Sequence, residues 1–235
     1  MKIKQIFALL AALFAALPCF SDDYPTISPT ATYTDSSAAE HTENPGASIS
    51  EQAPLTVRFE ANPENITAYS VNYRWEVFVE ADTIPEIVRY DESMELTFTT
   101  AGTRHIRLTA TFTDSDGVQT SMTSDNFNVT ISESKLEFPN AFSPNGDGIN
   151  DTYKAKAYQS IVEFQATIFN RWGQKIYSWD NPAGEWDGTF NGKPVKQGTY
   201  FVYVKAKGAD GQEYHIRRDV NLLRGYTESG STSAP

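Results

Sequence analysis

The sequence predicts an all-β fold, arranged as two β-sandwich domains in tandem. Three observations support this prediction. Phe and Tyr are abundant, with 14 and 12 copies among 235 residues, and both favour strands. Apolar residues alternate with polar ones over short stretches that Gly, Asn, Asp and Pro interrupt. The chain is long enough for two domains of about 100 residues, and each could bury its own hydrophobic core.

Residues 1–21 are predicted to be a signal peptide. Lys2 and Lys4 form a basic head, and the segment from Ile6 to Leu17 is continuously apolar. That length suits the core of a signal peptide and is too short for a permanent membrane span. We therefore expect export across the inner membrane.

Cys19 is the single cysteine of the chain and lies at the end of this segment. It could be the lipidated residue of a lipoprotein, but Pro18 stands where a lipoprotein signal usually has a small residue. Cleavage near Ser21 is therefore favoured over lipidation. The mature chain would then have neither a disulfide nor a thiol nucleophile.

The first sandwich is predicted over residues 51–133. Before it, residues 22–50 are rich in Ser, Thr, Ala and Pro, and we interpret them as a flexible leader with at most one edge strand near 31–34. The clearest strand of the domain carries Trp75 on its inward face, because apolar residues alternate around it. The strands predicted from alternation are 55–61, 71–77, 86–90, 94–99, 105–112 and 127–131.

Short strands at this spacing are typical of an Ig-like sandwich. The Trp75 strand, followed by the segment FTTAGTRHIRLTATFTDSDG, resembles the PKD-type variant of that sandwich. The usual Trp-Asp-Phe-Gly-Asp turn of the PKD family is absent, since Glu76 follows Trp75 here.

Charge is distributed unevenly along the chain. From Asp22 to Glu133 there are 19 acidic residues, five arginines and no lysine, whereas from Ser134 onward 11 acidic residues accompany 12 basic ones. This balance argues against nucleic acid as a partner, because phosphates need a basic surface. It also argues against electrostatic docking on an anionic membrane. Such acidity is typical of a soluble, surface-exposed module.

The second sandwich is predicted over residues 134–226, beyond a polar boundary at 132–135. Asn191-Gly192 is a two-residue hairpin signal within it. Residues 227–235 are small and polar, and we predict a disordered tail there. The clearest strands of the domain are predicted at 162–168, 175–179, 199–206 and 213–223.

Four separated blocks of this second sandwich carry a family resemblance: FPNAFSPNGDGINDTY, IFNRWGQKIYSW, WDGTFNGKPVKQGTYFVYV and RRDVNLLR. In order and spacing they resemble the type B sorting domain of the Bacteroidota type IX secretion system, also called the gliding-motility-associated C-terminal domain. The residues that carry the resemblance are Phe138, Pro139, Asn140, Phe142, Pro144, Gly146, Gly148, Asn150, Trp172, Gly173, Trp186, Asp187, Gly188, Gly198 and Tyr200.

The resemblance implies an Ig-like sandwich that serves as an export address across the outer membrane. It also implies docking to an outer-membrane β-barrel of the PorP/SprF type, with other type IX secretion components as further partners. Family members usually end near the block found here at 221–224, whereas this chain continues for eleven residues. The extension matters if recognition needs a free C-terminus, and it does not if the folded sandwich is bound.

A loop in the first block carries separate chemistry. Its oxygen-bearing residues recur at alternate positions around Gly148, as in the first half of an EF-type calcium loop. Lys154 stands where a bidentate Glu would close that loop, so a Ca²⁺ site would be weak. The alternative is a turn loop whose Asn and Asp side chains cap backbone amides. The candidate Ca²⁺ ligands are Ser143, Asn145, Asp147, the carbonyl of Ile149, and Asp151.

No arrangement of residues points to catalysis, and we expect the protein not to be an enzyme. The histidines lack the spacing of metal ligands or of a catalytic triad, and the sequence contains neither a phosphate-binding loop nor a nucleophile elbow. Trp172, Trp179 and Trp186 could form a platform that stacks on glycans, but core packing is the favoured interpretation. The three histidines are His41, His105 and His215.

Two functions remain after catalysis is set aside. The first is an adaptor or structural component of the secretion pathway, with the second sandwich seated on its barrel partner. The second is an exported surface adhesin or binding protein for which that sandwich is only the sorting signal. We favour the first, because only one small sandwich precedes the sorting-like domain. Both predict a location at the outer membrane, on the cell surface or outside the cell.

Overall fold

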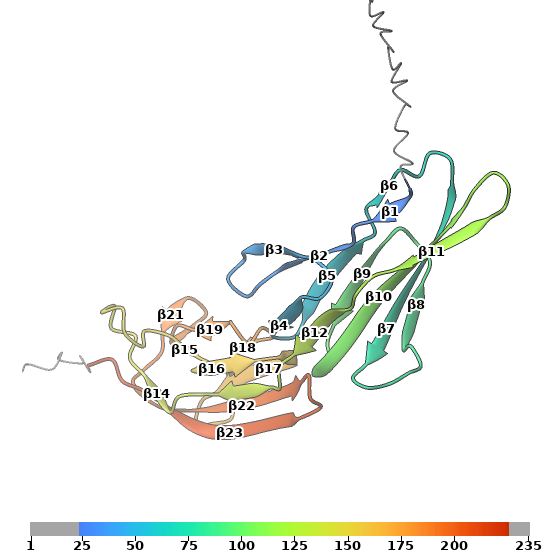
Figure 1. Ribbon diagram of the computed structural model, residues 1–235. Coiled ribbons are helices and arrows are strands. Elements are labelled where there is room, and N and C mark those ends of the chain that lie inside the picture. Colours follow the sequence, from blue (N-terminus) through green and yellow to red (C-terminus); the bar gives the residue numbers. More distant parts are fainter. Residues whose placement is uncertain (1–23, 226–235) are drawn as a thin grey trace, which may run out of the picture.

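The computed structural model describes residues 24–225. The predicted signal peptide at 1–21, Cys19 and the predicted tail at 227–235 lie outside the described residues. Every regular element within 24–225 is a strand. This part of the chain therefore has no helix with the length and apolar character needed to cross a bilayer. The predicted all-β fold is confirmed, and two sandwiches lie end to end (Figure 1).

The first sandwich consists of two facing sheets, with strand orders β3-β2-β5-β9 and β4-β12-β10-β7-β8. In the second sheet β4 runs parallel to β12, and β11 pairs with the far half of β10. The strands are β1 (Thr26–Ile27), β2 (Thr30–Thr34), β3 (Glu40–Glu43), β4 (Ser48–Glu51), β5 (Leu55–Glu60), β6 (Pro63–Glu64), β7 (Ser70–Val79), β8 (Ile87–Arg89), β9 (Ser93–Phe98), β10 (Gly102–Thr113), β11 (Gln119–Thr123) and β12 (Phe127–Ile131).

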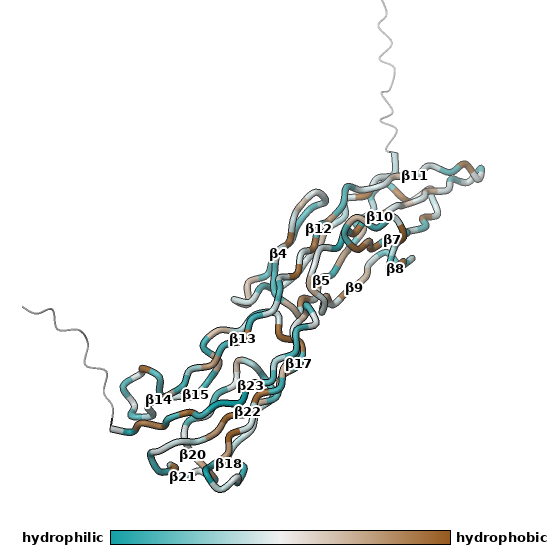
Figure 2. The backbone as a smooth tube through the Cα atoms, turned by 90° about the horizontal axis from the view of Figure 1, so that it is seen from below, coloured by the Kyte–Doolittle hydropathy of each residue, from teal (hydrophilic) through white to brown (hydrophobic). Residues whose placement is uncertain are grey.

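Trp75 lies at the centre of the first core, as predicted, and its side chain has no solvent exposure. Its ring packs against Phe59 with centroids 5.9 Å apart, and Phe59 packs edge-on against Phe127. The indole Nε1–H donates to the carbonyl oxygen of Asp91 at 3.1 Å, so the buried donor is satisfied. Hydrophobic and hydrophilic residues alternate along the strands (Figure 2).

The prediction of a flexible leader at residues 22–50 is wrong. β2, β3 and β4 all lie in this segment, and Ala31 and Ile49 are buried in the first core. β2 is also an internal strand rather than an edge strand, because β3 and β5 pair with it on its two sides. Several of the Ser and Thr residues that suggested a loose chain lie on the solvent-facing side of paired strands, among them Thr42, Ser48 and Ser50. The partner of β4 is β12, which is distant in sequence.

The second sandwich repeats the five-strand order of the first, with β14-β23-β22-β17-β18 in place of β4-β12-β10-β7-β8. β14 is parallel to β23, as β4 is to β12. Short pairs, β13-β16 and β15-β19, form the rest of the domain with the hairpin β20-β21. The strands are β13 (Lys135–Glu137), β14 (Ala141–Phe142), β15 (Tyr153–Lys154), β16 (Ala157–Gln159), β17 (Ile161–Phe169), β18 (Lys175–Trp179), β19 (Glu185–Trp186), β20 (Thr189–Phe190), β21 (Lys193–Pro194), β22 (Gly198–Gly208) and β23 (Glu213–Leu222).

The hairpin signal at Asn191-Gly192 is confirmed. Phe190 of β20 pairs with Lys193 of β21, and both turn residues have positive φ, 50° for Asn191 and 71° for Gly192. Two consecutive left-handed residues make the tight turn that an Asn-Gly pair favours.

Candidate functional site

The loop from Ser143 to Asp151 is held together by the carboxylate of Asp151. Oδ1 accepts hydrogen bonds from the backbone amides of Asn145 at 3.0 Å and Gly146 at 2.7 Å. Oδ2 accepts one from the amide of Gly148 at 2.8 Å. The bonds from Gly146 and Gly148 are the main reason that the pKa of Asp151 lies below its ordinary value.

Asp147, the other carboxylate of the loop, also caps the backbone. Its Oδ1 accepts from the amide of Ile149 at 2.8 Å, and its own amide donates to Oδ1 of Asn145 at 3.0 Å. The amide of Ser143 donates to the carbonyl of Asn150 at 2.7 Å. This is the bonding that the turn-capping alternative describes. Within residues 24–225, no three His, Cys, Asp or Glu side chains gather to hold a metal ion, and the calcium alternative is left to the experiment given in the Discussion.

The aromatic residues of the family blocks form the core of the second sandwich. Trp186 and Tyr153 are fully buried. Phe142 and Tyr200 each pack on Trp186 with ring centroids 5.3 Å apart, and Phe138 stacks on Tyr153 at 5.7 Å. These motif residues therefore specify how this sandwich packs.

Arg224, which sequence reasoning did not single out, ties the end of the last block to the rest of the domain. Its Nη2 donates to the carbonyl of Gly188 at 2.8 Å and its Nε to that of Val195 at 3.0 Å. Gly188 has a φ of +76°, and a Cβ there would press on Leu222 and on Pro144. The place of Arg224 at the end of RRDVNLLR was the available signal.

Core packing, the interpretation favoured for the three tryptophans, holds for Trp179 and Trp186 but is wrong for Trp172. Trp172 is 75% exposed, in the turn between β17 and β18, and the guanidinium of Arg171 lies 4.4 Å from its ring centroid. The last residues paired between β17 and β18 are Phe169 and Lys175, so Trp172 lies in the turn beyond the paired part of the sheet. Because the other two are buried, the three tryptophans form no joint platform.

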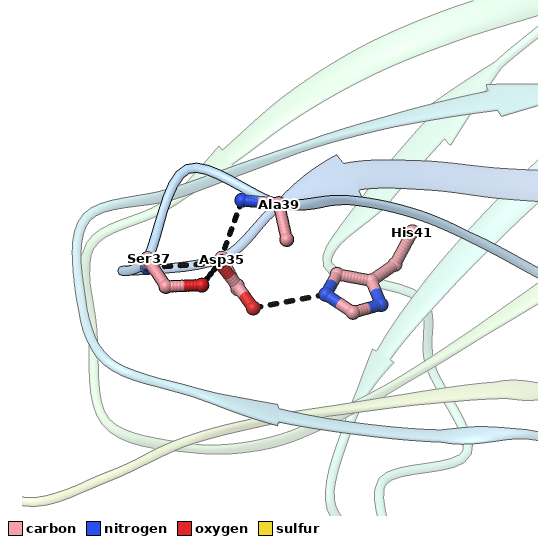
Figure 3. Close-up of polar contacts among 4 residues, drawn as sticks. All are labelled: Asp35, Ser37, Ala39 and His41. Atoms are coloured by element: carbon pink, nitrogen blue, oxygen red, sulfur yellow. Dashed lines mark hydrogen bonds and ion pairs between the residues drawn. The ribbon is translucent and has the colours of Figure 1, made fainter.

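The histidines lie apart, as their spacing indicated. His105 contacts Asn128 at 2.6 Å, and His215 lies 3.4 Å from Glu213. His41 is better placed than the sequence suggested, because Nε2 lies 2.9 Å from Oδ2 of Asp35 (Figure 3). Its ring also stacks on Tyr33, its partner across β2 and β3, with centroids 5.1 Å apart.

Asp35 is the centre of this cluster. Its Oδ1 accepts from the amides of Ser37 at 2.8 Å and Ala39 at 3.0 Å, and from the hydroxyl of Ser37 (Figure 3). The contact with His41, followed by that with the Ser37 hydroxyl, lowers the pKa of Asp35 well below its ordinary value. The carboxylate shapes the β2–β3 turn, and His41 is the one basic side chain of residues 24–225 that forms an ion pair with it.

Ser160 joins the two sandwiches. Its side chain is buried, and its Oγ accepts from the amide of Ala53 in the first sandwich at 3.1 Å. The same hydroxyl lies 2.9 Å from the hydroxyl of Ser132, at the end of the first domain. Ser160 has a φ of +47°, in the left-handed region that a non-glycine residue seldom adopts. The surrounding contacts hold it there.

The turn between β22 and β23 inserts into the end of the first sandwich. Ala209 of this turn is buried with the first domain's core, although it belongs to the second. Its amide donates to the carbonyl of Ser160, and its carbonyl accepts from the amide of Ala101, both at 2.9 Å. The bond from Ala101 crosses between the two domains at their contact, which is called the joint below.

The three-residue connection between β12 and β13 is fastened as well. Ser134 donates to the carboxylate of Asp210 from its amide at 3.1 Å and from its hydroxyl at 2.7 Å. The bonds from Ser134 lower the pKa of Asp210. A Cβ at Gly208 would overlap the hydroxyl of Ser134, so the close approach requires glycine. The joint is therefore a packed interface, and the short connection between the two domains is bonded to it.

The sequence blocks of the second sandwich agree with a known family. Residues 136–217 match the model of the CHU_C type IX secretion signal domain. The resemblance found in the sequence is thereby confirmed for this part of the chain, which is called the signal domain below. Such a signal indicates export to the cell surface or secretion. No curated protein matches the chain.

Several solved structures are similar to the chain at low identity. The fibronectin(III)-like modules of Clostridium thermocellum CbhA are 14% identical, with 81% of this chain and 96% of that one covered and a TM-score of 0.24. The Bacteroides ovatus protein SGBP-B is also 14% identical, with 85% and 48% covered and a TM-score of 0.27. Latent PorU from Porphyromonas gingivalis is 14% identical, with 88% and 21% covered and a TM-score of 0.25.

Proposed function

We propose that this protein is a non-enzymatic component of the type IX secretion pathway at the outer membrane. In this role the signal domain docks on a β-barrel of the PorP/SprF type. The acidic first sandwich is then held at a set angle to that barrel, where it contacts another secretion component. The protein acts as an adaptor or structural part.

The observation that carries this proposal is the packed joint. A domain that serves only as an address needs no fixed orientation toward the rest of the chain, and domains are ordinarily joined by exposed, flexible linkers that proteases can reach. Here Ser160, Ala209 and Asp210 close the joint from the signal-domain side with hydrogen bonds to the first domain or to its connecting segment. A stiff connection fits a protein that positions one partner relative to another.

The buried polar groups support a non-enzymatic role. Glu76, with 5% exposure, is bound by Arg74 at 2.9 Å and by Arg107 at 3.1 Å. Each carboxylate oxygen of Glu76 already contacts a guanidinium group, Oε1 that of Arg74 and Oε2 that of Arg107, so neither is open to a substrate. We therefore assign this cluster to the sheet's stability.

The alternative is an exported surface adhesin whose second domain is only a sorting signal. The family match itself favours it, because the matched domain is defined as a secretion signal. Both functions share the same location, and they differ in what remains bound to the protein after export.

Affinity capture with the full chain from detergent-solubilised outer membranes tests the proposal. We expect stable recovery of a PorP/SprF-like barrel, and failed secretion of other cargo in a deletion strain. Appearance of the protein in the medium, with all other secretion intact, would overturn the proposal in favour of the adhesin.

A Gly208→Ala chain, with its joint disturbed, is expected to capture the barrel but not to restore secretion. Gly225→Ala, where a Cβ meets no atom within 4 Å, is the matched control.

A further inference from the structure

The outer face of the signal-domain sheet carries an aromatic groove that the proposed function does not use. Phe201 of β22 pairs directly with Phe169 of β17, and Tyr203 lies two residues along the same strand. Directly paired residues of antiparallel strands share a face, and so do residues two apart. The groove has a volume of about 870 Å³, and Phe201 is 45% exposed in it.

The charged residues around these rings are mainly basic, and the exception is Asp219 of β23, which pairs with Phe201 and also lines the groove. Lys175 of β18 pairs with Phe169, and Arg217 of β23 pairs with Tyr203. The guanidinium of Arg217 lies 5.1 Å from the Tyr203 ring centroid, and the ammonium of Lys205 lies 5.9 Å from it. None of these three cations forms an ion pair with any carboxylate of residues 24–225. An apolar side chain flanked by carboxylates would therefore complement the groove.

The first sandwich presents such a segment in the loop between β7 and β8, residues 80–86. Ile84 is 80% exposed, the most exposed large apolar side chain in the described part of the chain. Glu80, Asp82 and Glu86 lie around it in sequence, all are exposed, and the loop has no basic residue. None of its three carboxylates is ion-paired within residues 24–225.

We propose that the aromatic groove binds the β7–β8 loop of a second copy of this chain. Ile84 would enter between the rings, and the loop carboxylates would face Lys175, Lys205 and Arg217. The charge imbalance between the domains favours contact of a first sandwich with a signal domain over contact of two like domains. The first sandwich is strongly acidic, whereas basic residues outnumber the single carboxylate of Asp219 around the groove.

The contact joins different surfaces of the two copies. In one molecule the loop follows Val79, whose pairing with Arg104 places it at the joint end of the first sandwich. Phe201 lies seven residues along β22 from the joint turn at Gly208, or about 23 Å for an extended strand. The loop and the groove of one molecule are therefore too far apart to meet, and we infer that the loop comes from a second copy. Because the contact is heterologous, each copy keeps one groove and one loop to offer to its neighbours.

Sedimentation of the purified protein over a range of concentrations tests this proposal. We expect mass to rise with concentration, and the association constant to fall about tenfold when salt rises from about 0.05 M to about 0.5 M, since exposed charges are screened. Phe201→Ser and Ile84→Ser should each weaken association about tenfold or more, as loss of a central apolar contact does. Neither side chain belongs to a core, so both variants should keep the wild-type melting curve.

The control is Val118→Ser, which removes a residue of similar kind, 61% exposed, in the β10–β11 turn. It should leave association unchanged. Charge reversal gives a second arm: Arg217→Glu and Glu86→Lys should each weaken association, and a mixture of the two variants should recover it. A protein that stays monomeric at every concentration, or a loss as large for Val118→Ser as for Ile84→Ser, would overturn the proposal. Barrel capture is measured separately, so failure of one proposal is distinguishable from failure of the other.

Discussion

The hydroxyl of Ser160 in the signal domain accepts a hydrogen bond from the backbone amide of Ala53 in the first sandwich, 3.1 Å away. Both residues are buried. A buried amide without a partner is costly, so this bond links the stability of one domain to the position of the other.

Ser160→Ala is therefore expected to lower the free energy of unfolding by about 1–3 kcal/mol, because the Ala53 amide loses its acceptor inside the joint. Chemical denaturation of the full chain measures the change. Ser121→Ala in the exposed strand β11 is the control, and its effect should stay within about 0.5 kcal/mol. Equal effects of the two substitutions would show that the joint bond contributes nothing.

Gly208→Ala should open the joint. The new Cβ would overlap the hydroxyl of Ser134, and the connection at 132–134 would have to shift. We expect limited proteolysis to release the signal domain from this variant faster than from the wild type. Gly225→Ala is the matched control, and cleavage at the wild-type rate in Gly208→Ala would contradict the packed joint.

Truncation of Trp186 should lower the free energy of unfolding far more than truncation of Trp172. Trp186→Ala removes a fully buried ring and should cost about 3–5 kcal/mol. Trp172→Ala removes a ring that is 75% exposed, and the free energy of unfolding should change by less than about 0.5 kcal/mol. A thermal or urea melt compares them, and a large loss for Trp172→Ala would place that ring in a contact absent from this structure.

Asp151 should contribute a pH-dependent stability. Its pKa is lowered in the folded protein by amides of Gly146, Gly148 and Asn145, so the contribution is present above the unfolded value of about 3.9 and lost as pH falls through the folded pKa. Asp151→Asn should remove this component of the acid transition. Superimposable acid melts of wild type and Asp151→Asn would refute the assignment.

Calcium provides a test of the same loop. Because backbone amides already occupy the carboxylates of Asp147 and Asp151, we expect no shift in Tm at several millimolar Ca²⁺, a range in which a weak extracellular site would bind. An upward shift that Asp147→Ala abolishes would establish the calcium site instead.

Much of the fold could be predicted from local patterns. Alternation around Trp75 and the Asn191-Gly192 turn depend on backbone geometry and on which face is apolar, and neighbouring residues in the sequence carry both signals. The family blocks likewise lie in continuous segments, so they marked the signal domain before its packing was known. The turn-capping role of Asp151 was available as an alternative for the same reason, since its partners lie within six residues.

Other features depend on partners that are distant in sequence. The sequence of β2 suggested a loose chain, and only its pairing with β5 makes it an internal strand. Trp172 was expected in the core, but it lies in a turn and is exposed. Ser160 and Ala209 are ordinary polar and small residues whose importance comes from contacts with Ala53 and Ala101 in the other domain. The sequence alone determined an all-β chain with a secretion-signal domain. Only the tertiary structure decided that its domains meet in a packed joint. The residues that bond across this joint are about 100 positions apart in the sequence, and no local pattern predicts contacts over that separation.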